Sequence, residues 1–224
     1  MMKSFTHLMQ QARHFHPGWS DRDLLGPRAA TQTELKATPD ARILSAMTWR
    51  IFCAGLNRSV VDGKWPAFEK AFFGFDPEKV SLMSDDHLDA LMQNRDLIRH
   101  FGKIKATRIN ALMIHEASQK EGGFGQFLAD WPVEDTMVGL WGFMKKEGAQ
   151  LGGNSGAYAL RIIGRDTPIL TDDVVVALKA QGVVDKRPSA KRDLLLVQEA
   201  FNHWRNESGF DLCQISRILS RSIG

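Results

Sequence analysis

The chain has few cysteines and no long apolar run. Cys53 and Cys213 are the only cysteines among its 224 residues, and they form no Cys-x-x-Cys pair. A disulfide framework and a zinc site built from thiolates are therefore not expected. No stretch approaches the roughly 18 uninterrupted apolar residues that indicate a membrane span. The first residues lack the hydrophobic core of a signal peptide, so we expect a cytoplasmic protein.

The chain also lacks a large excess of charge of one sign. Its formal net charge is +3, and 25% of its residues are charged, which is ordinary for a globular protein. Such a charge permits binding to nucleic acid but does not require it. Hydrophobic residues make up 43% of the chain, which is enough for a packed core in one or two domains.

Sustained alternation of apolar and polar residues, the signature of half-buried strands, is absent as well. Apolar residues instead recur with the 3.6-residue period of a helix, beginning with Ile43, Met47 and Ile51. A long helix is expected to end before Gly122-Gly123. Other helix starts are indicated near Pro66, Asp76, Ser84, Ser189 and Asp211. The pattern predicts an all-α protein.

The organisation along the chain changes near residue 40. Residues 1–40 are expected to form an irregular lead-in that packs on the core, because Pro17-Gly18, Gly26-Pro27 and Pro39 interrupt any long helix. Residues 41–224 are expected to form a single all-α unit of two lobes. We expect Asp172 and the preceding glycine-rich turn in the middle lobe, the C-terminal helices in the other lobe, and the substrate in the cleft between them.

The stretch from Leu140 to Leu178 is typical of a helix–turn–helix segment that binds the backbone of a nucleic acid. A first helix ends near two lysines, a glycine-rich turn follows, and a second helix begins after it. Such a turn aims backbone N–H groups and a helix N-terminus at a phosphate. The alternative is an ordinary helix–helix turn with a glycine C-cap. The residues expected to contact the DNA backbone are Gly152, Gly153, Asn154, Ser155, Gly156, Lys145 and Lys146.

Three blocks of sequence carry a resemblance to a known family. They run from Cys53-Ala54-Gly55-Leu56 to Val80, from Ile98 to Ala106, and from Lys145-Lys146 to Thr171-Asp172-Asp173-Val174-Val175. In this order and with these gaps, the chain resembles the helix-hairpin-helix DNA glycosylase superfamily, and in particular its 3-methyladenine DNA glycosylase I branch. The resemblance implies a two-lobed all-α fold. It does not by itself identify the substrate.

The chain departs from that branch at several functional positions. The family has a glutamate shortly before its Ala-Gly-Leu, where this chain has Arg50, and an aromatic residue shortly after it, where this chain has Arg58. Asp173 and Ala177 stand where the family has the C-terminal ligands of a structural zinc. We therefore expect no metal and no other cofactor, and a remodelled base pocket.

The resemblance places the catalytic carboxylate at Asp172, after an apolar run and at the start of a helix. A carboxylate beside C1′ of the sugar stabilises the oxocarbenium-like transition state of base excision. Asp173 is the rival for this role. The alternative is that one of the two aspartates only caps the helix that follows.

A glycosylase also holds the extruded base between aromatic and apolar groups. The candidates for this base pocket are Trp49, Arg50, Arg58 and Tyr158. Trp49 is the strongest aromatic candidate because it adjoins Arg50. The alternatives are that the aromatic residues belong to the core and that the arginines lie on the surface of a helix.

Two functions from different classes remain open. The first is a monofunctional DNA glycosylase that removes a damaged, alkylated purine during base excision repair. Its turn holds Asn154 and Ser155 and offers no lysine for a Schiff base. The second is a DNA-binding protein with the same hairpin that has lost the chemistry. In both cases we expect a monomer whose partner is double-stranded DNA, and no membrane partner.

Overall fold

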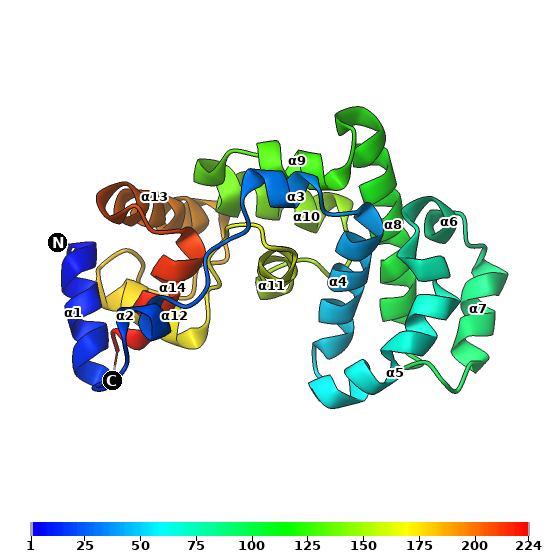
Figure 1. Cartoon of the computed structure of the whole chain (residues 1–224), viewed down its shortest axis with the longest axis horizontal. Helices are drawn as coiled ribbons and strands as arrows, with labels where there is room; N and C mark the ends of the chain where they lie inside the picture. Colours follow the sequence, from blue (N-terminus) through cyan, green and yellow to red (C-terminus); the bar gives the residue numbers. More distant parts are fainter. Residues whose placement is uncertain (1, 224) are drawn as a thin grey trace. The chain divides into compact units, whose positions relative to one another are not determined.

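The computed structural model describes residues 2–223, and within them it contains fourteen α-helices and no strand (Figure 1). The all-α prediction is therefore confirmed. None of these helices combines the length and the apolar character that a membrane span requires. The helices divide into two compact units, each with its own core.

The terminal unit comprises residues 2–30, 132–142 and 166–223. Besides a 3-10 turn at Val133–Asp135 and a π-helical turn at Thr136–Leu140, it contains five helices. They are α1 (Phe5–Phe15), α2 (Asp21–Leu25), α12 (Asp172–Ala180), α13 (Lys191–Ser208) and α14 (Leu212–Arg221). Their apolar faces meet in one cluster around Phe201 and Trp204, both fully buried.

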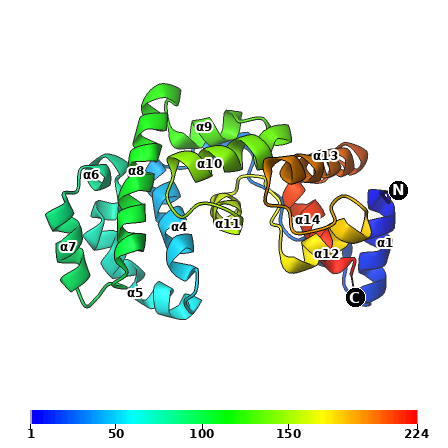
Figure 2. The same ribbon diagram turned by 180° about the vertical axis from the view of Figure 1, so that it is seen from behind.

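The middle unit comprises residues 31–131 and 143–165. Its helices are α3 (Gln32–Lys36), α4 (Asp40–Cys53), α5 (Arg58–Ala71), α6 (Pro77–Ser81), α7 (Asp85–Gln93), α8 (Phe101–Glu121), α9 (Phe124–Asp130) and α11 (Asn154–Ile163). The division between the units falls inside α10 (Trp141–Glu147), after Gly142. Helix α8 packs against α4, α6, α7 and α9, as Figures 1 and 2 show.

Stacked aromatic rings anchor α5 in the middle unit. Trp65 and Phe68 lie 5.1 Å apart between ring centroids, and Phe72 and Phe75 lie 5.6 Å apart, both pairs nearly parallel. Pro66 lies inside α5 rather than at its start, so that sequence prediction was wrong. The helix begins eight positions earlier, at Arg58, and Asn57 is its N-cap because its side chain accepts a hydrogen bond from Ser59 N.

The lead-in is more regular than the sequence pattern indicates. Helix α1 has eleven residues and ends just before Pro17-Gly18, where a helix break is expected. Ser4 caps it by accepting a hydrogen bond from His7 N. Phe5 and Leu8 are buried in the core of the terminal unit, so the apolar face of α1 stabilises the helix through tertiary packing.

The helix that begins at Asp172 lies with the C-terminal helices, whereas we expected it to share a lobe with the glycine-rich turn. Helix α12 packs against α14 and contributes Val174, Val175 and Leu178 to the apolar cluster of the terminal unit. The turn itself belongs to the middle unit. The physical reason is the apolar face of α12, which packs against α14.

Candidate functional site

The turn between α10 and α11 adopts a conformation that requires glycine at two points. Gly153 is the N-cap of α11 and has a φ of 57°, in the left-handed region that side chains disfavour. Gly156 lies so close to the carbonyl oxygen of Leu151 that a Cβ at this position would collide with it. The backbone is therefore closely packed between Leu151 and Gly156, and the residues that follow Leu151 have small or no side chains.

A buried amide fixes the start of this turn. Asn110, on α8, is fully buried. Its Oδ1 accepts a hydrogen bond of 2.7 Å from Ala149 N, and its Nδ2 donates one of 3.1 Å to Ala149 O. Nearby, Gln150 Nε2 donates to Gly102 O at 2.9 Å. Helix α8 thus holds both residues that precede the turn, and sequence reasoning missed this support.

The beginning of α11 has the features of an anion site. Gly153 has no side chain to accept hydrogen bonds from the first turn of the helix, so these N–H groups receive no cap from the N-cap residue. Lys145 and Lys146 are exposed at the end of α10. Lys146 also bonds Glu147 at 2.7 Å, which raises the pKa of its ammonium group. A helix of ten residues that begins after a glycine N-cap, with two lysines nearby, suits the binding of an anion such as phosphate.

The four residues predicted for the base pocket lie on three helices of the middle unit, in two pairs. The guanidinium of Arg50, on α4, lies over the ring of Tyr158, on α11, at 4.4 Å from its centroid. Arg58, at the start of α5, lies over the ring of Trp49 at 5.0 Å. Helices α4 and α11 pack directly against each other, which brings the first pair together.

Asp62 organises the second pair. Its carboxylate accepts a hydrogen bond of 2.7 Å from Trp49 Nε1 and lies 3.4 Å from Arg58 Nε. The spacing of four residues between Arg58 and Asp62 places them on the same face of α5. The indole of Trp49 is therefore held in one orientation by a carboxylate at its edge and a cation over its face.

Lys103, on α8, caps the C-terminal end of α4 with its ammonium group. It is 7% exposed, and its ammonium donates to Phe52 O at 3.2 Å and to Ala54 O at 2.7 Å. A cation at this end of a helix complements both the free carbonyls and the helix dipole. Burial lowers the pKa of Lys103, and repulsion from Arg50 lowers it further.

Cys53 lies among these charged groups. Burial raises the pKa of its thiol, Asp62 adds to the increase, and Arg50, Arg58 and Lys103 oppose it. We call this group of side chains the arginine–aromatic cluster. Its members are Trp49, Arg50, Cys53, Arg58, Asp62, Lys103 and Tyr158. It contains three cations and one carboxylate, so it is electropositive.

Asp172 lies at the first position of α12 with a side chain that is 92% exposed. It is not the N-cap: Thr171 is, because its side chain accepts a hydrogen bond from Val174 N at 3.3 Å. The carboxylate of Asp172 forms an ion pair with Arg187, which also donates to Leu170 O at 3.0 Å. Asp173 is exposed in the same helical turn.

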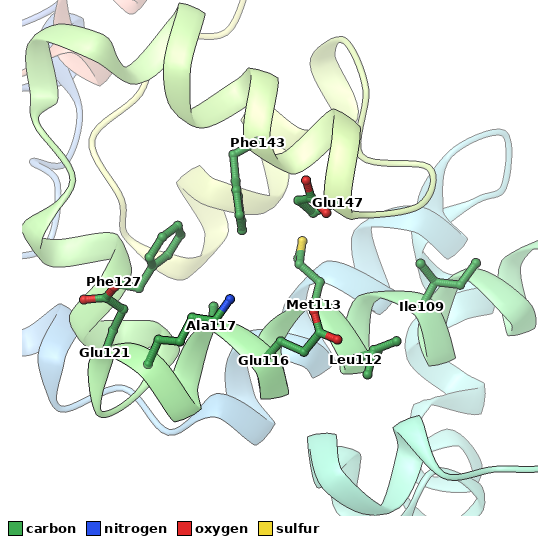
Figure 3. Close-up of a pocket in the computed structure, with 10 residues that line it drawn as sticks. Ile109, Leu112, Met113, Glu116, Ala117, Glu121, Phe127, Phe143 and Glu147 are labelled. Carbon is green, nitrogen blue, oxygen red and sulfur yellow. The ribbon is translucent and has the colours of Figure 1, made fainter.

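A cavity of about 390 Å³ lies elsewhere in the middle unit, between α8, α9 and α10 (Figure 3). Phe127, Phe143 and Met113 supply its apolar wall. Glu116 on α8 and Glu147 on α10 face each other across it in this view. An excess of carboxylates repels phosphate, so this cavity does not suit a DNA backbone.

Comparison with known proteins identifies the family. A family model described as methyladenine glycosylase matches residues 35–151, which is more than half of the chain. The chain belongs to the methyladenine glycosylase family.

Two curated members of the methyladenine glycosylase family are similar to segments of this chain that are shorter than the one the family model matches. A DNA-3-methyladenine glycosylase from Haemophilus influenzae is 43% identical over 58 residues, which cover 26% of this chain and 31% of the relative. DNA-3-methyladenine glycosylase 1 from Escherichia coli is 35% identical over 75 residues, which cover 34% of this chain and 40% of that protein. These matches therefore span less than half the length of either relative.

The fold agrees with a solved structure of the same family. The 3-methyladenine DNA glycosylase I from Staphylococcus aureus, from a structural study of 3-methyladenine recognition, superposes with a TM-score of 0.51 at 21% sequence identity. The superposition covers 70% of this chain and 91% of the other. The glycosylase-like fold expected from the sequence is thus confirmed.

Some candidate residues lie inside the segment that matches the glycosylase family model, and others lie beyond it. Trp49, Arg50 and Arg58 lie inside the matched segment, as do both lysines of α10. The match ends at Leu151, so the turn from Gly152 onward and Asp172 lie beyond it. Within residues 2–223, no group of three or more His, Cys, Asp and Glu side chains is arranged to hold a metal ion.

Several contacts of the site were not foreseen from the sequence. Asn110, Lys103 and Arg187 were missed because each acts through a partner far away in the chain. In the structure, Arg187 pairs with Asp172, Tyr158 lies under Arg50, and Asp62 pairs with Arg58. A lysine on an otherwise apolar face of α8 was the signal available for Lys103.

Proposed function

We propose that this protein is a monofunctional DNA glycosylase that hydrolyses the N-glycosidic bond of a damaged, alkylated purine in base excision repair. The family match over residues 35–151 is the observation that carries the proposal. The names of the H. influenzae and E. coli relatives point to the same reaction. Double-stranded DNA with a damaged base is the proposed partner, and the protein acts as a monomer in the cytoplasm without a cofactor.

The turn between α10 and α11 is proposed to hold the DNA backbone. The positive φ of Gly153, which is exposed, leaves the backbone of the turn accessible to a phosphate. Gly156, which we expected at this surface, is instead buried against Leu151 O and supports the turn from inside. Gly152, Asn154 and Ser155 complete this surface, and Lys145 and Lys146 add positive charge. These contacts orient the duplex and carry no information about its sequence.

Asp172 is proposed to stabilise the cationic sugar as the base departs. A carboxylate near C1′ lowers the energy of an oxocarbenium-like transition state and orients the attacking water. The ion pair with Arg187, which is itself tied to Leu170 O, supports this role because it holds the carboxylate in one orientation. Asp173 remains the rival, since it is exposed in the same turn of α12.

The arginine–aromatic cluster is proposed to receive the extruded base. Trp49 and Tyr158 offer flat faces, and Arg58 and Arg50 lie over them. A base that enters the cluster exchanges these cation–π contacts for stacking and hydrogen bonds. The absence of a lysine among residues 151–156 is the reason to propose hydrolysis without a Schiff base.

The test is a base-release assay on a panel of duplexes, each with one lesion at a defined position. Wild-type protein should leave an abasic site, detected by alkaline strand cleavage, and should not cleave the strand without alkali. Strand cleavage without alkali would contradict the monofunctional mechanism. Binding to every duplex without release of any base would support the alternative, a DNA-binding protein without activity.

A further inference from the structure

The loop between α12 and α13 in the terminal unit carries an excess of positive charge. Figure 1 shows its place between the two helices. We call residues 186–192 the basic segment, and its exposed cations are Lys186, Arg187, Lys191 and Arg192. The net charge of the whole chain is only +3, so four cations within seven residues are a local excess that indicates an anionic partner.

The backbone of the basic segment is anchored to the protein. Val184, just before the segment, is 7% exposed, and Pro188 inside it is buried. Between them, Arg187 pairs with Asp172 and donates to Leu170 O at 3.0 Å. The side chain of Arg187 is thus engaged within the protein, and the loop presents its other cations from an anchored backbone.

The remaining cations are available, and two of them are placed unfavourably in their own helix. Among residues 2–223, Lys186, Lys191 and Arg192 pair with no carboxylate. Lys191 and Arg192 are the first two residues of α13, where the helix dipole favours anions. Asp193 follows them and offsets one charge, while the N-cap residue Ala190 has no side-chain acceptor for the first N–H groups. A local cost of this kind is expected where it serves a function, and a bound phosphate would offset it.

DNA is the anion that fits the surroundings of the basic segment. In the proposed reaction, Asp172 approaches C1′ of a sugar that is joined to a phosphate on each side. The carboxylates of Asp172 and Asp173 repel those phosphates, and Arg187 neutralises only the first of the two carboxylates. Cations on the same loop offset the remaining repulsion, because they attract phosphates close to the carboxylate that the reaction needs.

We infer that Lys186, Lys191 and Arg192 form a second phosphate-binding surface for DNA, in the terminal unit, whose contacts add to those of the hairpin. The inference rests on the proposed glycosylase function and names the residues that hold the substrate beside Asp172. Arg187 remains the partner of Asp172 and is not one of these contacts. Because the contacts are to phosphates, they favour no sequence and no lesion.

The test measures binding to an undamaged duplex by fluorescence anisotropy at several salt concentrations. Replacing both Lys191→Gln and Arg192→Gln should make the slope of log K against log salt shallower by about 1.8, the value for two phosphate contacts. Lys186→Gln should make it shallower by about 0.9. Arg22→Gln is the matched control, because Arg22 is an exposed cation on α2 of the same unit, and it should leave the slope unchanged.

Charge reversal at the start of α13 separates a binding role from a structural one. Acidic residues in the first turn favour the helix dipole, so the double variant Lys191→Glu, Arg192→Glu should unfold at a temperature roughly 2 °C higher than wild type. The same variant should bind the duplex more weakly than the double Gln variant, because it repels the phosphates. Differential scanning fluorimetry measures the first effect and the anisotropy titration the second.

Three results would overturn the inference: an unchanged slope in the double Gln variant, an equal change in Arg22→Gln, or a lower unfolding temperature in the double Glu variant, which would make the cations structural. The proposed function is tested separately by base release. Release of no base from any lesion, together with the expected slopes, would refute the glycosylase function and leave the phosphate-binding surface standing.

Discussion

Asp172 and Asp173 are adjacent and both exposed, yet the structure gives them different surroundings. Asp172 pairs with Arg187, and Arg187 is tied to the backbone at Leu170 O. Thr171 already caps α12, so neither aspartate is needed for that purpose. The difference between the two carboxylates is therefore their neighbouring cation, and a pair of matched variants can separate their roles.

Asp172→Asn keeps the shape of the side chain and removes its charge. If Asp172 stabilises the cationic sugar, base release should fall by about 100-fold, the scale of losing a preorganised electrostatic group. Duplex binding should stay nearly unchanged. Single-turnover base release and a binding titration measure the two effects, with Asp173→Asn as the control. Wild-type rates in Asp172→Asn would end this assignment, and a large loss only in Asp173→Asn would transfer the role to its neighbour.

Asn110 is expected to stabilise the protein through its two hydrogen bonds to Ala149. Asn110→Ala removes both hydrogen bonds to Ala149 and leaves the N–H and C=O of that residue without their partner. The free energy of unfolding should fall by about 2 kcal/mol, typical of buried polar groups left unsatisfied. Urea denaturation followed by circular dichroism measures the change. The exposed Ser59, replaced by alanine, provides a surface control, and an equal loss in both variants would contradict this role of Asn110.

At the scale of elements, the sequence predicts most helices because their starts depend on local chemistry. Asp76, Ser84 and Asp211 are N-caps as predicted, and α8 ends at Glu121, just before the expected glycine pair. Ser189 is not a cap: Ala190 takes that position without a side-chain hydrogen bond. Pro66 misled the prediction because proline favours a first helical turn, while aromatic stacking of Trp65 keeps it inside α5.

The candidate site was less predictable than the helices. Neighbours within one turn, such as Arg58 and Asp62, follow from their spacing. The contact of Arg50 with Tyr158 joins residues more than one hundred positions apart, and only the packing of α4 on α11 brings them together. The pair of Asp172 and Arg187 depends on the path of the chain after α12, which no periodic pattern in the sequence encodes.

The hairpin formed by α10 and α11 is expected to contact phosphates of the duplex through Gly153. Gly153→Val places a β-branched side chain at a φ of 57°, where it is strained, and covers the start of α11. Binding to any duplex should weaken by the same factor, whatever its sequence or lesion, because the turn contacts phosphates. Fluorescence anisotropy with damaged and undamaged duplexes measures this. Gly63→Ala, in a helix with open space around it, is the control. Unchanged binding of Gly153→Val at low salt would remove the hairpin from the DNA contact.

At the scale of the whole molecule, the modest net charge of +3 is distributed unevenly. The arginine–aromatic cluster and the end of α10 are positive, whereas the cavity between α8, α9 and α10 carries Glu116, Glu121 and Glu147. Contacts to DNA are therefore expected to be few and local. A protein of this kind should lose affinity with salt according to the number of phosphates it neutralises and not according to its total charge.

Salt dependence of DNA binding tests this distribution. The logarithm of the binding constant should fall linearly with the logarithm of salt concentration, with a slope of about −0.9 for each phosphate contacted. Lys145→Ala should make the slope shallower by about one contact, because Lys145 is exposed and lies beside Gly152 in the hairpin. Lys120→Ala should leave it unchanged, because Lys120 lines the acidic cavity. Binding that does not respond to salt, or an equal change in both variants, would show that the lysines of α10 do not contact the duplex.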